Sequence, residues 1–173
     1  MAKMKDRVNL AAYKETITAP LRRATLCFLV RDNQVLLAMK KRGFAEGKWN
    51  GSGGKSKPED KSIEATAKRE MVEETMVTPR NLKKVAILNF YFPDKSDWNQ
   101  QVSVFLTSEW NGTPTETEEM APKWFNLNEI PYNQMWDDDV LWLPKVLDGK
   151  IIEGNFLFGK NQKMLEHKIV EIA

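Results

Sequence analysis

The sequence predicts an α/β (α+β) fold in which a mixed β-sheet is covered by helices on both faces. Segments with the two-residue alternation of a β-strand outnumber segments with helical spacing. No internal repeat is visible, so an array of repeated units is not expected. The length of 173 residues corresponds to one ordinary domain with a sizeable core. Together these observations favour a layered mixed-sheet domain.

The chain divides into a polar N-terminal extension, residues 1–20, and a domain, residues 21–173. The extension contains one weakly helical stretch, Val8–Lys14. The domain begins with two β-rich runs, Thr25–Val30 and Val35–Met39, which are separated by residues that favour turns. We therefore predict a β-hairpin at the start of the domain.

A glycine-rich loop and a helix follow the hairpin. The stretch Gly43–Gly54 has too many glycines and too little periodicity for a helix or a strand. Ser62–Thr75 is predicted to be helical because Ile63, Ala67 and Met71 recur every four residues. This spacing places the three apolar side chains on one face of the helix.

The second half of the chain contains most of the predicted strands and a second helix. Val85–Phe92 alternates as a half-buried strand does, and Asn111–Gly112 is a hairpin-turn signal. Asp137–Leu147 is predicted to be helical, with acidic residues in its first turn, where the helix dipole favours them. The other predicted strands are Val102–Leu106, Lys123–Asn126, Ile151–Phe158 and Met164–Ile172.

The composition excludes several classes of protein. Apolar residues make up 42% of the chain and charged residues 29%, which is typical of neither a disordered nor a membrane protein. The longest apolar run, Ala24–Val30, is too short to span a bilayer, and no secretory signal is visible. A net charge of +2 is too small to indicate nucleic-acid binding. We expect a cytoplasmic monomer without nucleic-acid or membrane partners.

The rarest residues limit the chemistry. The chain has one cysteine, Cys27, and one histidine, His167, so a disulfide, a thiolate zinc site or a multi-histidine site cannot form within it. We predict that Cys27 is a small buried residue and that His167 has a structural or surface role. An enzyme of this composition would rely on carboxylates, which favour hard ions such as Mg²⁺ or Mn²⁺.

Three carboxylates share one face of the first domain helix. Each helical residue turns by about 100°, so Glu70, Glu73 and Glu74 fall within about 100° of arc. Ile63 and Ala67 lie on the same stripe, so the buried side of the helix runs into the carboxylates. Like charges at this spacing repel, which favours a divalent-metal site over a solvated acidic face.

The segment Gly54–Val77 resembles a Nudix box, in which a glycine, a glutamate and an Arg-Glu-apolar-x-Glu-Glu motif follow one another at fixed spacing. The matching residues are Gly54, Arg69, Glu70, Met71, Glu73, Glu74 and Val77. The resemblance implies a Nudix-like α/β/α sandwich with Mg²⁺, or Mn²⁺, bound by Gly53, Glu70, Glu73 and Glu74. It also implies that Arg69 orients these carboxylates.

Two positions depart from the box. Gly54 and Arg69 are fifteen positions apart instead of fourteen, so the loop holds an extra residue. The first box glutamate is therefore replaced by Asp60, shifted out of register, or lost to Lys61. Met76 stands where the box has a glycine that caps the helix in a left-handed conformation. That conformation costs a methionine about 1–2 kcal/mol, so we expect the helix to end in another way.

The resemblance extends from about Thr25 to Ile172. Over this range the sequence is similar to the MutT-type, or 8-oxo-dGTP diphosphatase, branch of the family. Lys40–Phe44, Gly47–Gly51 and Ile130–Asp139 are the segments that carry it most clearly. The implied substrate residues are Thr25, Lys40, Phe44, Asn50, Phe90, Trp136, Asp138 and Asp139. Aromatic faces can sandwich a base, and two adjacent carboxyls in an apolar pocket can share a proton and so offer both a donor and an acceptor. For Lys40, a solvated basic patch and triphosphate binding remain alternatives.

The resemblance implies Mg²⁺-dependent hydrolysis of oxidised purine nucleoside triphosphates to the monophosphate and pyrophosphate, which would keep damaged nucleotides out of DNA. The implied catalytic residues are Arg69, Glu70, Glu74 and Glu119. One of the three glutamates would accept the proton of the attacking water. Two alternatives remain: hydrolysis of another nucleotide, and a Nudix-fold nucleotide-binding module without turnover. The intact glutamates favour an enzyme, whereas Asp60 and Met76 favour the module.

Overall fold

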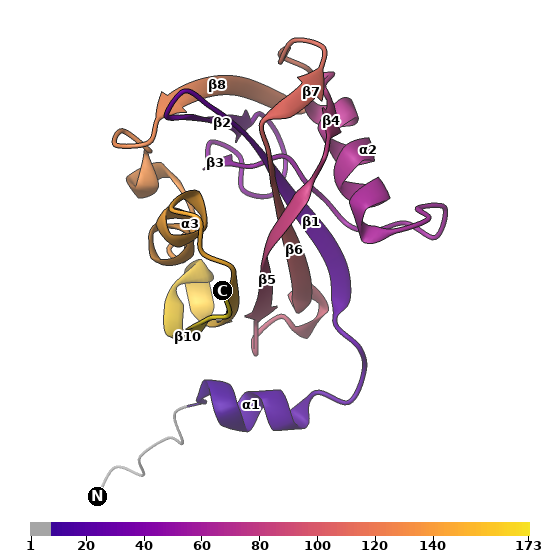
Figure 1. Cartoon of the computed structure of the whole chain (residues 1–173). Helices are drawn as coiled ribbons and strands as arrows, with labels where there is room; N and C mark the ends of the chain where they lie inside the picture. The colour runs from indigo at the N-terminus through magenta and orange to yellow at the C-terminus, as the bar shows by residue number, and fades with distance from the viewer. Residues whose placement is uncertain (1–7) are drawn as a thin grey trace, which may run out of the picture.

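The computed structural model describes residues 8–173, which form a mixed β-sheet flanked by helices (Figure 1). Residues 1–7 of the predicted N-terminal extension lie outside the described part. The helices are α1 (Leu10–Thr16), α2 (Ile63–Thr75) and α3 (Asp139–Leu147), with short 3₁₀ turns η1 (Ser96–Trp98), η2 (Tyr132–Gln134) and η3 (Lys160–Gln162). The strands are β1 (Arg22–Arg31), β2 (Gln34–Lys40), β3 (Trp49–Asn50), β4 (Thr78–Arg80), β5 (Lys83–Tyr91), β6 (Gln100–Thr107), β7 (Glu109–Asn111), β8 (Met120–Asn126), β9 (Ile152–Phe158) and β10 (Met164–Glu171).

The main sheet has eight strands and both kinds of pairing. Its order is β10-β9-β5-β6-β1-β2-β3, and β8 also pairs with β2. The β1–β6 and β5–β9 pairs are parallel, whereas the other pairs are antiparallel. β4 and β7 form a separate two-stranded sheet. The predicted mixed-sheet α/β class is therefore confirmed.

The predicted hairpin between β1 and β2 is confirmed. The two strands pair over only a short stretch, which creates space for a site. The strands pair only at the turn, where Asp32 and Asn33 have φ values of 45° and 62°, as a two-residue hairpin requires. Away from the turn, β1 pairs with β6 and β2 pairs with β8. The two strands therefore diverge, and the segment 51–55 enters the gap.

Apolar side chains pack on both faces of the sheet, and α2 and α3 lie on opposite sides of it (Figure 1). Trp142 of α3 meets Phe28 of β1 with ring centroids 6.0 Å apart. On the other face, Ala67 and Met71 of α2 pack with Cys27, and all three are buried as predicted. None of the helices among residues 8–173 is long and apolar enough to cross a membrane.

Two turn-rich regions differ from their predictions. The Gly43–Gly54 segment contains the short strand β3, which pairs with β2, although no regular element was expected there. Asn111 and Gly112 do not connect a hairpin, because β7 pairs with β4 instead of β8. A Cβ atom on Gly112 would lie 2.9 Å from the Met76 carbonyl oxygen, and its φ is +94°. The glycine is required by this close approach and backbone conformation.

The end of α2 also differs from its prediction. Met76 occupies the left-handed position after the helix, with φ 62° and ψ 24°, and its N–H donates to the Val72 carbonyl. The expectation that a methionine would avoid this conformation is wrong. Met76 is 62% exposed, so its side chain meets no tertiary obstacle, and the backbone hydrogen bond and the following strand β4 offset the local steric cost of the conformation.

Replacing Met76 with Gly is expected to raise stability by about 0.5–1 kcal/mol, because glycine adopts a positive φ without a steric penalty but is more flexible when unfolded. Thermal unfolding would measure this as a melting temperature a few degrees higher. Met76→Ala is the control, since it removes the side chain and keeps the penalty. Turnover should stay within about twofold. A large gain in rate would show that the natural chain is an impaired catalyst and would favour the binding-module alternative.

Candidate active site

The segment 51–55 brings backbone groups into the gap between β1 and β2. The Thr25 N–H donates to the Gly54 carbonyl at 2.9 Å, and the Cys27 N–H donates to the Ser52 carbonyl at 2.7 Å. A Cβ atom on Gly53 would lie 1.8 Å from the Thr25 carbonyl oxygen, so only glycine fits. Within residues 8–173 the Gly53 carbonyl accepts no backbone hydrogen bond. It is therefore free to serve as an oxygen ligand.

Helix α2 places two of the three predicted carboxylates against this segment. A Glu74 carboxylate oxygen accepts a hydrogen bond from the Gly53 N–H at 3.3 Å. The Glu70 carboxylate lies so close to Gly54 that a Cβ atom there would come within 2.5 Å of it. Glu73 lies further out, with 50% of its side-chain surface exposed.

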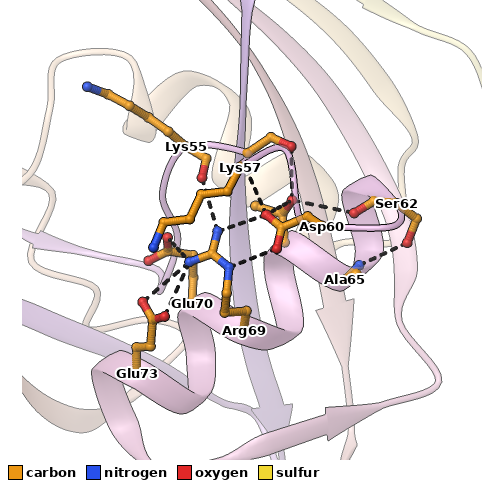
Figure 2. Close-up of polar contacts among 10 residues, drawn as sticks. Lys55, Lys57, Asp60, Ser62, Ala65, Arg69, Glu70 and Glu73 are labelled. Carbon is orange, nitrogen blue, oxygen red and sulfur yellow. Dashed lines mark hydrogen bonds and ion pairs between the residues drawn. The ribbon is translucent and has the colours of Figure 1, made fainter.

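Arg69 connects the carboxylates of α2 to the preceding loop (Figure 2). Its Nη1 donates to Glu70 at 2.8 Å and lies 3.3 Å from a Glu73 oxygen. Its Nε and Nη2 each donate to Asp60 at 2.9 Å, and Nη2 also donates to the Lys55 carbonyl. A bidentate guanidinium–carboxylate pair of this kind fixes the geometry of both partners.

Asp60 takes the place left open for the first box glutamate. Besides Arg69, its carboxylate accepts hydrogen bonds from the Lys57 N–H at 2.9 Å and the Thr66 hydroxyl at 2.8 Å. The Arg69 guanidinium holds the pKa of Asp60 well below its usual range. Lys61 is exposed. Of the three alternatives for this position, the structure therefore supports replacement by Asp60.

Burial and a neighbouring carboxylate disfavour the ionised form of Glu74. Burial, followed by the charge of Glu70, raises the pKa of Glu74 to about 8, although the Gly53 N–H and Lys40 partly oppose this rise. No three acidic, histidine or cysteine side chains within residues 8–173 converge closely enough to hold an ion. The donor set nevertheless suits a divalent cation, because carboxylate and carbonyl oxygens are the ligands that Mg²⁺ prefers and the cation would offset the repulsion.

Glu119, the residue directly before β8, lies in the same region. It forms an ion pair with Arg42, which lowers the pKa of Glu119 from its usual value. Its backbone carbonyl accepts a hydrogen bond from the Lys41 N–H at 3.0 Å. The Thr117 hydroxyl, two residues earlier, donates to the Glu74 carbonyl at 2.9 Å, which ties this loop to the end of α2.

A cavity of about 610 Å³ connects the carboxylate end of the site to the predicted base pocket. Its volume lies in the range of small-molecule sites. The predicted site residues that line it are Thr25, Lys40, Phe44, Asn50, Gly53, Glu74, Phe90, Glu119, Trp136, Asp138 and Asp139. Arg69, Glu70 and Glu73 lie beside the cavity on α2 without lining it. The fold thus brings together every substrate residue that the resemblance implied.

Asp138 and Asp139 form a buried pair at the start of α3, and each is 2% exposed. One Asp138 oxygen accepts a hydrogen bond from the Trp142 indole N–H at 2.8 Å, and one Asp139 oxygen accepts from the Trp136 backbone N–H at 3.0 Å. Burial raises the pKa of both carboxyls, and the Asp138 charge raises that of Asp139 further. Asp138 makes no side-chain capping bond to α3, so capping does not account for its burial.

Aromatic side chains form the walls of the cavity. The Phe44 ring lies 5.5 Å from the Trp136 ring between centroids and remains 48% exposed. The Lys48 ammonium lies 5.4 Å above Trp136. Phe90 lines the cavity and stacks on Phe156 at 5.3 Å, so it belongs to the wall and to the core at once.

The remaining predicted residues present polar groups. The Thr25 hydroxyl is buried and has no hydrogen-bond partner within the described residues. The Asn50 side-chain oxygen accepts from the Gly51 N–H at 2.8 Å, which leaves its amide N–H groups to donate. Lys40 forms no ion pair with any of residues 8–173, whereas Lys41 pairs with Glu116 at 2.8 Å.

Trp98 and Arg22 are among the cavity-lining residues that the sequence reasoning missed. Trp98 lies 4.6 Å from Phe44 between ring centroids, and Arg22 has a buried Nε without a partner among residues 8–173. A tryptophan within a polar turn, as at Ser96–Trp98, is a signal that could have identified the first. No local pattern distinguishes Arg22 from the adjacent Arg23.

Comparison with known proteins gives consistent matches. The family described as NUDIX domain matches residues 20–146. The oxidized purine nucleoside triphosphate hydrolase of Danio rerio is 41% identical over 148 residues, covering 86% of this chain and 94% of the relative, and that of Mus musculus is 40% identical with the same coverage. A crystal structure of a MutT protein from Bacillus halodurans has a TM-score of 0.75 at 27% identity and covers 86% of this chain and 97% of its own.

Proposed function

Because the chain belongs to the Nudix family of hydrolases, we propose that it hydrolyses oxidised purine nucleoside triphosphates, such as 8-oxo-dGTP, to the monophosphate and pyrophosphate. Such a reaction removes damaged nucleotides before they enter DNA. The main support for this proposal is the cavity. Gly53 and Glu74 line one part of its wall, and the Asp138–Asp139 pair lines another. One nucleotide can therefore contact both sets of groups.

The carboxylate end of the cavity is the proposed place of the triphosphate. We propose Mg²⁺ as the cofactor, held by Glu70, Glu73, Glu74 and the Gly53 carbonyl. When bound, such an ion neutralises phosphate oxygens and lowers the pKa of water. Arg69 keeps Glu70 and Glu73 in place through its hydrogen bonds. Lys40 lines the cavity and would attract the phosphates.

The aromatic end of the cavity is the proposed place of the base. Phe44 and Trp136 would each offer an aromatic surface to a purine ring. Asn50 would donate to one edge, and each aspartate of the pair has one carboxyl oxygen that is not used by Trp136 or Trp142. If the pair shares one proton, it can donate to a carbonyl oxygen and accept from N–H groups, as an oxidised guanine requires.

A general base must remove a proton from the attacking water, and the electrostatics separate the candidates. Arg42 stabilises the ionised form of Glu119, which makes it a weaker base. Glu74 lines the cavity and forms no ion pair with any of residues 8–173. We therefore propose that Glu74 accepts the proton, and we rank Glu70 and Glu119, each paired with an arginine, below it.

A panel of nucleoside triphosphates, assayed with Mg²⁺ and with all products identified, tests the proposed function. We expect an oxidised purine triphosphate to give the highest kcat/KM, with pyrophosphate and a monophosphate as products and no activity after chelation of the metal. Preference for another purine would change the substrate and keep the chemistry. Tight nucleotide binding without any product would contradict an enzyme and support the binding-module alternative.

A further inference from the structure

We propose that α1 holds in place the part of the nucleotide-pocket wall that Trp98 forms. Within α1, Tyr13 acts on Trp98 through its hydrogen bond with Asn99. The proposal rests on the function proposed above, because it concerns the same pocket. α1 spans Leu10–Thr16 and lies outside residues 20–146, the part of the chain that matches the family. Tyr13 is therefore a positioning residue, supplied by a segment beyond the matched domain.

α1 packs against the outer face of two strands whose other face lines the pocket. On β5 and directly after it, Phe90 and Phe92 line the cavity, whereas Tyr91, between them, faces α1. The Tyr13 and Tyr91 rings meet edge to face with centroids 6.1 Å apart. Leu157 of β9 joins the same cluster. The helix thus covers the back of the pocket wall.

A buried amide links this helix to the turn that carries Trp98. The Asn99 side-chain oxygen accepts a hydrogen bond from the Phe92 backbone N–H at 2.7 Å, and its amide nitrogen donates to the Tyr13 hydroxyl at 3.0 Å. Asn99 is 9% exposed, and it immediately follows Trp98. Figure 1 shows α1 beside the turn that joins β5 and β6. One side chain therefore connects both ends of this turn to α1.

The Trp98 ring depends on the position of the same turn. Its centroid lies 4.6 Å from that of Phe44 and 5.6 Å from that of Phe92, and the Lys95 ammonium lies 4.1 Å above it. Loss of the Tyr13 hydroxyl would leave the buried Asn99 amide without its partner, and such groups move to recover a hydrogen bond. A shift of Asn99 displaces Trp98 and changes the width of the pocket.

Tyr13→Phe tests the proposal because it removes the hydroxyl and keeps the ring that packs on Tyr91. We expect KM for the preferred purine triphosphate to rise roughly two- to tenfold, the range of one buried hydrogen bond, with kcat nearly unchanged and the melting temperature a few degrees lower. In a Trp98→Ala background the same substitution should have no further effect on KM, because coupled residues are non-additive. Additive effects in this cycle would overturn the proposal.

Glu166→Gln is the matched control. It weakens the contact of a Glu166 carboxylate oxygen with the N–H of Leu10, the first residue of α1, and leaves the Tyr13–Asn99 hydrogen bond in place, so KM should not change. A second measurement does not require turnover: the emission of Trp98, obtained as the difference between each protein and its Trp98→Phe variant, should shift in Tyr13→Phe. An unshifted emission would overturn the proposal. If the wild-type protein hydrolyses no nucleotide, only the proposed function is overturned, because the emission measurement does not depend on turnover.

Discussion

Replacing Glu74 with Gln is expected to lower kcat by about two to four orders of magnitude, the usual contribution of a positioned acid–base group. The amide has the same shape, but it neither binds a divalent cation well nor accepts a proton. The measurement is steady-state turnover of the preferred triphosphate at saturating Mg²⁺, with thermal unfolding in parallel. A metal titration would separate the two roles, because a lost ligand raises the Mg²⁺ requirement and a lost base does not.

Folding should survive this substitution. Glu74 is largely buried beside Glu70, so the neutral amide removes a repulsion from the metal-free protein, and its melting temperature should be equal to or above that of the wild type. Glu64→Gln is the control, since Glu64 is an exposed glutamate in the first turn of the same helix. Full activity of Glu74→Gln would remove Glu74 from the site. A large loss of stability with a proportionate loss of activity would indicate a structural role.

Asparagine at either position of the acidic pair is expected to abolish most of the selectivity between an oxidised and an ordinary guanine triphosphate. An amide fixes donor and acceptor, whereas the two carboxyls can adjust by sharing a proton. A lost pair of base contacts is worth roughly 1–3 kcal/mol, or about ten- to a hundredfold, and we expect most of it in KM. The assay compares kcat/KM for the two triphosphates in wild type, Asp138→Asn and Asp139→Asn.

Asp137→Asn is the matched control, because Asp137 is exposed and adjacent in sequence. It should leave the substrate ratio unchanged, and Mg²⁺ dependence should persist in all three variants, since the α2 carboxylates are untouched. Unchanged ratios in both pair variants would show that the aspartates do not recognise the base. Only general pyrophosphohydrolase activity would then remain.

The same pair gives a pH dependence with a definite sign. Burial raises the pKa of both aspartates in the folded protein above the ordinary value of 3.8, so the folded state holds protons that the unfolded state has released. Their contribution to stability is therefore complete below about pH 4 and is lost as the pH rises through the raised values. Asp139→Asn should make the fall in stability over this range shallower in denaturant unfolding. Affinity for an oxidised guanine should fall over the same range as the shared proton is lost.

Local sequence patterns were sufficient wherever neighbouring residues control the outcome. The four-residue spacing of Ile63, Ala67 and Met71 predicted α2, and the same geometry put the three glutamates on one of its faces. The turn residues between β1 and β2 predicted their hairpin. Such features depend on contacts within a few residues, so a single segment of sequence contains the necessary information.

Turn signals and departures from the box were less informative, because distant segments determine how they are used. The Asn111–Gly112 signal predicted a hairpin turn, but the strand β7 pairs with β4, so no hairpin forms there. The methionine after α2 adopts a left-handed conformation because the surrounding chain holds it there. The pairing of Asp60 with Arg69 also could not be chosen from spacing alone, since an extra loop residue allowed several registers.

The mixed α/β class, the carboxylate face of α2 and the types of side chain available for chemistry followed from periodicity and composition, because these are local properties of the chain. Which of these side chains share one cavity depends on the packing of distant segments. The divergence of β1 and β2 admits the segment 51–55, and the start of α3 brings Asp138 and Asp139 to the same space. The same packing buries Glu74, Asp138 and Asp139, which raises their pKa values, and it brings Tyr13 within hydrogen-bond distance of Asn99. Desolvation and long-range hydrogen bonds depend on which distant segments pack together, and that packing is a property of the whole fold.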